Sequence, residues 1–293
     1  MTKDLEKKMF VPIPGIVDFA NYLITDEYNE IFPIVNIVLA VFFFFYRFKR
    51  PCPYGRLRPQ NKKLGAEISP KLAFMIFNLI PFAVTLYFRA YYRYLFSEIP
   101  LINISIIFWL TVYLFRGTIY ALLRSKFSNP WPVKTVIYFL LMNISKSILF
   151  VRCITFQNWE LKGAYKITLC VLWVIAFLFG AKYDIQLTLK RFKNAKGYKF
   201  MKGGIYNLIT CPNYFFEFLM NLFLILMIDN DIYSVAVFIW MLPNVLTRAE
   251  TLHYWSKKFH KPNYPKNRAS FIPFIKFESV LEAFLTTLEY GGF

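Results

Sequence analysis

The chain has 293 residues, of which 57% are hydrophobic and 20% aromatic, and it carries a formal net charge of +18. This balance is too apolar for a soluble domain unless much of the surface faces hydrocarbon, so it indicates a polytopic membrane protein. The positive charge does not indicate a nucleic-acid-binding protein, because no basic loop combines its Lys and Arg with a folded aromatic platform.

Apolar stretches along the chain predict the membrane-spanning helices. A hydrocarbon core of about 30 Å needs about 20 residues per helix. Seven stretches meet or approach this length, and they lie at 30–46, 71–92, 100–123, 132–151, 167–189, 213–229 and 231–247. The sequence therefore predicts an all-α integral membrane protein with seven transmembrane helices, of which the first and the last two are short.

The basic residues of the connections predict the orientation of these helices. Connections rich and poor in Lys and Arg alternate, with seven such residues in 47–70, one in 93–99, seven in 182–204 and none in 229–231. By the positive-inside rule, this pattern predicts a cytoplasmic C-terminus and an N-terminus across the membrane. Before the first span, 10–25 is too short and too rich in Pro to cross, so we expect it to lie in the interface.

Polar residues inside apolar spans are costly, so their positions are informative. In the third span, Tyr113, Arg116 and Tyr120 follow the spacing i, i+3 and i+7, which places them on one helix face. This stripe favours a role in lining a cavity. The alternative is an aromatic belt at the membrane surface with a snorkelling Arg.

A second polar stripe ends the fifth span. Asp184, Thr188 and Arg191 share one face there. A carboxylate near the C-terminal end of a helix opposes the helix dipole and needs compensation. Asp184 is therefore either an acceptor for a polar cofactor or half of an ion pair with Arg191 or Lys182 at the membrane surface.

The third stripe opens the sixth span, in the sequence NLITCPNYFFEF at 207–218. We expect Thr210 to cap this helix and Pro212 to occupy its first turn. Asn213, Glu217 and Asn221 then recur every four residues on one side of an apolar helix, so this side does not face lipid.

The helix N-terminus at this position also suits an anionic ligand. It presents free N–H groups and a partial positive charge, and the preceding loop adds Lys196, Lys199 and Lys202. A phosphate-bearing ligand entering from the cytoplasm would fit such a seat. The alternative is simple capping together with hydrogen bonds between helices.

The composition does not favour a metal or haem site. The four Cys have no CxxC spacing and the chain contains only two His. This composition predicts neither a disulfide framework nor a zinc or iron site.

Two separated motifs resemble a known family. GYKFMKGGIYNLITCPNYFFE at 197–217, followed by LTRAETLHYWSKKFHKPNYPKNRASFIPFI at 246–275, resembles the C-terminal domain of the steroid 5-alpha-reductase family. PYGRL at 53–57 and VYLFRGTIY at 112–120 are similar to upstream motifs of the same family. A sister group, the very-long-chain trans-2-enoyl-CoA reductases, shares this C-terminal domain.

The resemblance implies an oxidoreductase that uses NADPH to reduce a carbon-carbon double bond conjugated to a carbonyl. It makes Tyr113 the hydroxyl that polarises the carbonyl, with Asn78 and Glu217 also in the catalytic group. By position, it assigns cofactor contacts to Asn213, Asp184, Thr188, Arg191, Tyr198, Lys202, Tyr214 and Arg268. The chain has no GxGxxG sequence, so the dinucleotide is expected in a helical cavity rather than on a Rossmann sheet.

The family also implies an organisation and a location. The whole chain is expected to form one polytopic domain in the endoplasmic reticulum membrane, with a lipid substrate and no metal. Its predicted parts are an interfacial segment 1–29, a five-helix substrate part 30–190, a reductase-like part 191–277 and an amphipathic tail 278–293.

One departure from the family concerns the second span. Steroid reductases carry there a Glu that pairs with the catalytic Tyr, and ungapped alignment places Asn78 at this position. An Asn side chain can donate to or accept from Tyr113 but cannot titrate. The predicted substrate is a 3-oxo-steroid or sterol-like lipid, with an enoyl-CoA, or a non-catalytic lipid-binding scaffold, as alternatives.

Overall fold

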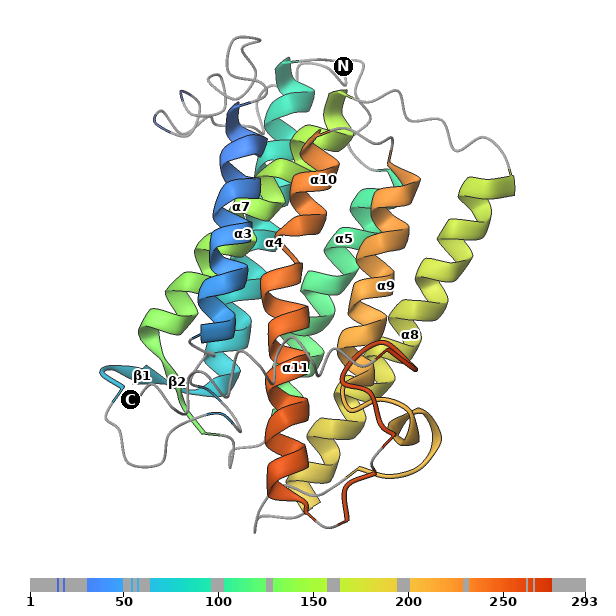
Figure 1. Ribbon diagram of the computed structural model, residues 1–293. Coiled ribbons are helices and arrows are strands. Elements are labelled where there is room, and N and C mark those ends of the chain that lie inside the picture. Colours follow the sequence, from blue (N-terminus) through green and yellow to red (C-terminus); the bar gives the residue numbers. More distant parts are fainter. Residues whose placement is uncertain are drawn as a thin grey trace.

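The structure is a computed structural model, shown in Figure 1. It describes residues 15, 18, 31–49, 54, 57, 64–95, 103–124, 129–156, 164–193, 201–228, 232–261, 263–265 and 267–275. The side chains of 48–49, 94–95, 156 and 190–193 lie outside the description. The interfacial segment expected at 10–25, apart from 15 and 18, and the tail expected at 278–293 also lie outside the described residues.

Helices make up most of the described chain, as the sequence predicts. They are α3 (Ile31–Lys49), α4 (Pro70–Leu95), α5 (Ile104–Phe115), the π-helix η3 (Arg116–Tyr120), α6 (Ala121–Leu123), α7 (Val133–Phe156), α8 (Ala164–Lys193), the 3-10 helix η4 (Gly204–Asn207), α9 (Pro212–Met227), α10 (Ile232–Ile239) and α11 (Leu242–Phe259). The long helices form one bundle in which they run roughly alongside each other (Figure 1).

Among the described residues, five helical segments are long and apolar enough to cross a membrane. They are Pro70–Arg93, Ile104–Leu123, Val133–Thr155, Ala164–Leu189 and Ile232–Phe259. Ile31–Arg47 and Pro212–Met227 are apolar but shorter. The chain is thus a multi-pass membrane protein, while the count of seven spans and the cytoplasmic C-terminus stay predictions.

The last span is longer than the predicted 231–247. A turn at Trp240 and Met241 separates α10 from α11, which has Pro243 in its first turn and continues to Phe259. Arg248, Glu250 and His253 on this extension are buried. Hydropathy ended the span too early because these polar side chains contact other protein segments and do not face lipid.

The all-α prediction needs one small addition. The two-residue strands β1 (Glu67–Ile68) and β2 (Trp131–Pro132) pair antiparallel, with Glu67 opposite Pro132 and Ile68 opposite Trp131. Trp131 is buried, and its ring stacks on Tyr54 at 3.7 Å between centroids. This short pair of strands therefore holds Trp131 in its stack with Tyr54 at one end of the bundle.

The third span changes its winding midway. Asn103 caps α5 by accepting a hydrogen bond from the backbone N–H of Ile106 at 3.0 Å. The helix then widens into η3, a type of turn that is frequent at functional sites. Gly117 lies in this turn, and a Cβ atom there would be 2.7 Å from Leu79 Cδ2. The glycine thus allows η3 to approach α4 closely.

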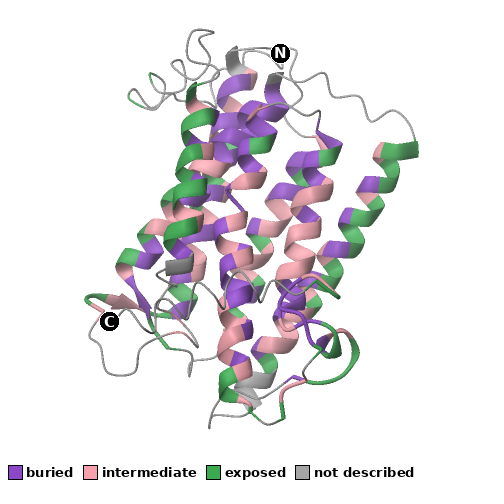
Figure 2. Cartoon of the chain, in the orientation of Figure 1, coloured by how far each residue is buried: buried purple, intermediate pink, exposed green. Residues whose placement is uncertain are grey.

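The outer surface of the bundle is apolar, as expected for contact with lipid. Ile167, Val171 and Leu178 on α8 are 54%, 54% and 60% exposed. Figure 2 shows exposed residues along the outward sides of α3 and α8 and buried residues between the helices. Aromatic stacking fills the interior, for example between Trp109 and Phe150, whose centroids are 4.1 Å apart.

The two motifs of the C-terminal part lie against each other. Ile209 and Ala269 form a parallel bridge, and the backbone N–H of Thr210 donates to the carbonyl of Ala269 at 2.9 Å. Thr210 does not cap α9 as predicted, because Cys211 holds the N-cap position and makes no side-chain capping bond. The hydroxyl of Thr210 instead contacts His253 Nδ1 at 2.7 Å and Tyr264 Oη at 2.5 Å.

The reason for this correction is tertiary. Folding of the chain brings α11 and the 263–275 segment beside Thr210, and both offer its hydroxyl a partner. Pro212 does occupy the first turn of α9, as predicted. The loop before α9, the start of α9 and the last motif of the chain therefore form one packed unit.

Candidate active site

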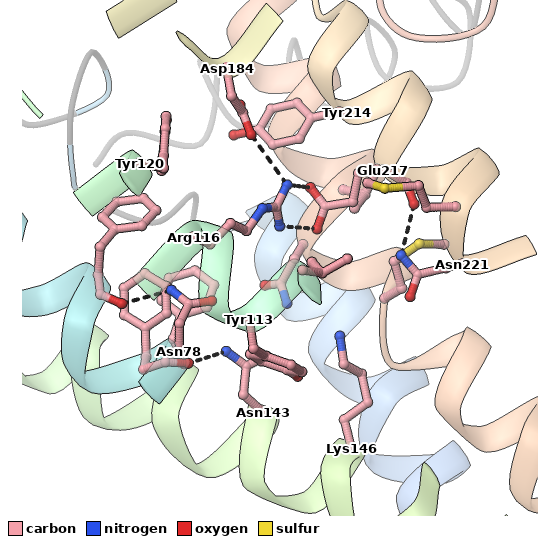
Figure 3. A pocket seen from close by; sticks show the side chains of 18 of the residues that line it. Asn78, Tyr113, Arg116, Tyr120, Asn143, Lys146, Asp184, Tyr214, Glu217 and Asn221 are labelled. Atoms are coloured by element: carbon pink, nitrogen blue, oxygen red, sulfur yellow. Dashed lines mark hydrogen bonds and ion pairs between the residues drawn. The ribbon is translucent and has the colours of Figure 1, made fainter. Parts of the chain in front are cut away.

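A cavity in the bundle is lined by residues from each of the three polar stripes of the sequence (Figure 3). The third-span stripe contributes Tyr113, Arg116 and Tyr120 to its lining. The sixth-helix stripe contributes Asn213, Glu217 and Asn221, and the fifth span contributes Asp184. These seven residues therefore face one cavity, while the catalytic and cofactor roles predicted among them stay predictions.

Among the described residues, the cavity is partly enclosed and partly open to solvent. The volume of the cavity that water can enter is about 160 Å³. The total unfilled volume is about 1130 Å³ when adjoining open solvent is included. Aromatic walls surround it, among them Phe108 and Trp173, whose rings are parallel at 4.0 Å. The enclosed part suits a flat ring system or an extended acyl chain.

An ion-pair cluster forms one side of the cavity. Arg116 Nη1 and Nη2 donate to Glu217 Oε1 and Oε2 at 2.6 Å and 2.7 Å, a bidentate geometry. Arg116 Nη2 also lies 3.6 Å from Asp184 Oδ2. Arg116 therefore does not snorkel to the surface, and it joins three helices instead. An unpaired Arg at this depth would cost about 2.5 to 3.5 kcal/mol.

Asp184 has two partners that the sequence alternatives did not name. Besides Arg116, it accepts a hydrogen bond from Asn213 Nδ2 at 3.1 Å, so α8 and α9 are joined at the cavity wall. Thr188 is buried, and its hydroxyl donates to the carbonyl of Asp184 at 3.0 Å within the same helix. Thr188 does not line the cavity, and the side chain of Arg191 lies outside the described residues.

The sixth-helix stripe agrees with both interpretations of the sequence, because it lines a cavity and also makes hydrogen bonds between helices. Asn213 makes a hydrogen bond between helices, as the simpler alternative expects, and it also faces the cavity. Asn221 Nδ2 donates to the backbone carbonyl of Glu217 at 2.8 Å. The carboxylate of Glu217 is occupied by Arg116, so in this structure it positions a cation rather than acting as an unpaired acid.

Tyr113, the predicted catalytic residue, has an unsatisfied hydroxyl. Tyr113 is 5% exposed and its oxygen makes no hydrogen bond. Asn78 also lines the cavity, but its Nδ2 donates to the carbonyl of Phe74 at 2.7 Å within α4. Within the described part of the chain, no hydrogen bond joins Asn78 to Tyr113.

Several polar lining residues were not predicted as site residues. Arg116, Tyr120 and Asn221 appeared only as members of stripes, while Arg124, Asn244, and Asn143 and Lys146 on α7 were not considered. Asn143 Nδ2 donates to the carbonyl of Phe77 at 2.8 Å. The available signal for Lys146 was its charge, the only one between residues 135 and 151 of an apolar span.

The remaining predicted cofactor contacts divide between the cavity and the loop before α9. Tyr214 lines the cavity. Lys202 is exposed on that loop. Arg268 is buried, donates to the carbonyl of Met201 at 3.1 Å and has a pKa lowered by that burial. Tyr198 lies outside the described residues.

Comparison with known proteins agrees with this arrangement. The sequence profile of the family "3-oxo-5-alpha-steroid 4-dehydrogenase" matches residues 129–276. The chain is 27% identical over 233 residues to steroid 5-alpha-reductase DET2 of Arabidopsis thaliana, covering 76% of this chain and 87% of the relative. It is 28% identical over 233 residues to a putative enoyl reductase of Schizosaccharomyces pombe, covering 73% and 74%.

A shorter match involves a third kind of reductase. The polyprenal reductase of Caenorhabditis elegans is 33% identical over 75 residues, which cover 25% of this chain and 23% of that protein. The family profile spans half of the chain, from the strand β2 through α7, α8, α9 and α11 to the final motif. The chain therefore belongs to the 3-oxo-5-alpha-steroid 4-dehydrogenase family.

Proposed function

We propose that this protein reduces a carbon-carbon double bond conjugated to a carbonyl in a lipid substrate, with NADPH as the reductant. The observation that carries the proposal is the Tyr113 hydroxyl, which is buried, lacks a hydrogen-bond partner and belongs to a residue lining an aromatic cavity inside a membrane bundle. A buried hydroxyl without a partner is costly, and a carbonyl oxygen would satisfy it. Membership in a reductase family supports the same reaction.

The residues of the cavity fit a dinucleotide at its polar side. Asp184 and Asn213 offer an acceptor and a donor suited to ribose and amide groups, and Tyr120 and Tyr214 offer rings and hydroxyls beside them. The enclosed space is too small for a whole dinucleotide and a substrate together, so we expect most of the cofactor toward the part of the cavity that is open to solvent. When bound, NADPH would supply a hydride to the β carbon of the substrate.

The chain's own residues would then polarise and orient the substrate. Tyr113 would donate a hydrogen bond to the carbonyl oxygen, which draws electron density away from the double bond. Arg116 and Glu217 would hold the polar side rigid through their bidentate pair. Asn78, already held by the carbonyl of Phe74, would shape the cavity wall beside Tyr113 rather than exchange protons.

The walls of the cavity favour a ring-shaped substrate. Stacked aromatic rings at Phe108 and Trp173, which are parallel, and at Phe77 and Trp131, which are inclined by 27°, form apolar surfaces. A 3-oxo-steroid or sterol-like lipid matches such surfaces, and the similarity to a steroid 5-alpha-reductase supports this class. A trans-2-enoyl-CoA is the second candidate, favoured by the similarity to a putative enoyl reductase.

The test is a pair of assays on the purified full chain in lipid nanodiscs. NADPH at 100 times its dissociation constant should stabilise the protein by ~2.7 kcal/mol, measured by thermal unfolding. NADPH oxidation is then followed with an enone steroid and with a trans-2-enoyl-CoA. Turnover of one substrate identifies the class. Absence of both stabilisation and turnover would favour a non-catalytic lipid-binding scaffold instead.

The setting of this activity also belongs to the proposal. We propose one polytopic unit in the endoplasmic reticulum membrane, in which a substrate part at 30–190 and a reductase-like part at 191–277 both contribute residues to the cavity. Trp109, Tyr113 and Asn143 lie in the first part, and Asn213 and Glu217 lie in the second. Fluorescence microscopy of a tagged chain tests the location.

A further inference from the structure

Two buried hydroxyls without hydrogen-bond partners lie on α5 and α7, two of the helices that contribute to the cavity wall. The hydroxyls of Tyr113 and Ser147 are both buried and lack partners. Lys146 precedes Ser147 on α7, and its Nζ lies 5.9 Å from the centre of the Tyr113 ring. Figure 3 shows Lys146 extending toward the same space as Tyr113.

Lys146 is placed where an ammonium group needs an anion. It lies thirteen residues into the 24-residue helix α7, about 20 Å from its start, which is near the middle of the bundle. Its Nζ is 5.2 Å from the centre of the Trp109 ring, and within the described residues no hydrogen bond or ion pair joins it to an acceptor. Such positions in membrane proteins mark functional sites.

The described acidic side chains of the cavity form no ion pair with Lys146. Glu217 directs both carboxylate oxygens to Arg116, and Asp184 lies against Arg116 and Asn213. The ammonium of Lys146 makes contact with neither carboxylate at ion-pair distance among the described interactions. It therefore forms no ion pair with the cluster, although Glu217 is close enough to attract it electrostatically, and it lies beside the ring of Tyr113.

We propose that Lys146 is a further catalytic residue, which forms with Tyr113 an oxyanion hole for the substrate carbonyl. This inference rests on the proposed function. When a hydride from a reduced nicotinamide dinucleotide adds to the β carbon, the electron pair of the double bond moves and leaves a negative charge on the carbonyl oxygen. The ammonium and the phenol hydroxyl stabilise that enolate, and the carbonyl re-forms as the α carbon takes a proton from water.

A binding experiment tests the oxyanion hole without turnover. 2-Naphthol carries one ionisable oxygen on a flat ring system, and its naphtholate form is identified by its absorbance. Wild-type protein should bind it as naphtholate at a pH at least one unit lower than Lys146→Met does, a tenfold shift in its ionisation. Lys146→Arg should restore part of the shift. Equal ionisation in wild type and Lys146→Met, or no ionisation in either, would overturn the proposal.

Kinetics separate this role from simple substrate binding. With NADPH and the substrate class that is turned over, Lys146→Met should lower kcat roughly 100-fold and leave KM within about threefold. A change in KM alone would overturn the proposal, because it would mean that Lys146 binds the ground state. Lys134→Met, an exposed Lys on the same helix, is the matched control and should match wild type.

The two proposals fail in different ways. If the wild-type protein shows no turnover of either substrate, the proposed reduction is wrong, and the naphthol titration still decides whether Lys146 and Tyr113 hold an oxyanion. If turnover is found and the titration shows no effect of Lys146→Met, the reductase stands and the oxyanion hole does not. NADPH-dependent stabilisation of Lys146→Met should equal that of wild type, which shows that the variant is folded.

Discussion

Replacing Arg116 by Met should destabilise this protein more than any other single removal of charge at the cavity. Arg116 is the shared partner of two carboxylates, with two hydrogen bonds to Glu217 at 2.6 Å and 2.7 Å and a contact to Asp184 at 3.6 Å. Met preserves most of the side-chain length and removes the guanidinium. Both carboxylates would then remain in the bundle without a cation at contact distance.

The expected magnitude follows from the geometry. Opposite charges about 4 Å apart attract by about 4 kcal/mol at an effective dielectric constant of 20. Breaking a fully buried pair by removing one partner costs about 3 to 5 kcal/mol, since an uncompensated charge stays behind. The side chains of Arg116 and Glu217 are 20% and 16% exposed, so the cost here should lie toward the lower end of that range. Part of this loss is recovered if Glu217 takes up a proton. We therefore expect Arg116→Met to lower the free energy of unfolding by about 3 kcal/mol.

A double-mutant cycle with Glu217→Gln measures the coupling of the pair. Thermal unfolding of the four proteins in nanodiscs should give a coupling energy of about 2 to 3 kcal/mol, because Gln costs little once Arg116 is gone. Lys134→Met, which removes an exposed charge from α7, should change stability by less than about 0.5 kcal/mol. Additive effects of the two substitutions would refute the assignment of a guanidinium paired with Glu217.

The remaining predictions concern single side chains. Tyr113→Phe removes a hydroxyl without a partner, so stability and NADPH binding should stay near wild type while turnover falls by roughly 100-fold or more; equal turnover would remove this hydroxyl from the mechanism. Gly117→Ala should cost about 1 to 3 kcal/mol, since its Cβ would be 2.7 Å from the side chain of Leu79; Leu79→Ala should relieve that clash in the double variant, and Gly180→Ala, whose Cβ would be 3.4 Å from its nearest neighbour, is the control for unfolding midpoints. Burial raises the pKa of Tyr264 to about 12, from a usual value of 10. The unfolded chain therefore loses this proton first, and the contribution to stability, up to about 2 to 3 kcal/mol, should be present below pH 10 and lost between pH 10 and 12. Unfolding midpoints across this range should fall less steeply for Tyr264→Phe, and identical slopes would contradict the raised pKa.

Several features of the candidate site were readable in the sequence because helical spacing is a local property. Tyr113, Asp184, Asn213 and Glu217 were each placed on a polar face by residue spacing alone, and all four line one cavity. Thr188 follows the same spacing as Asp184 but bonds to its own helix backbone instead. Spacing identifies a face, and it does not say how far a short side chain reaches across that face.

The partners of these residues were not readable in the same way. Arg116 and Glu217 are 101 residues apart, and their pairing depends on how η3 packs beside α9. Thr210 illustrates the same limit, because its expected cap was replaced by contacts with His253 and Tyr264, which arrive from later in the chain. Long-range contacts such as these depend on packing that no short stretch of sequence encodes.

By itself, the sequence determined the membrane character of the protein, most of its helices and the faces that avoid lipid, because hydropathy and the 3.6-residue period act within one helix. The packing of the helices was needed to show that α11 continues to Phe259, that a π turn carries Arg116 and that Lys146 lies near the Tyr113 ring. The physical reason is that the cost of a polar or charged group in a bilayer is set by its neighbours, and those neighbours come from other helices.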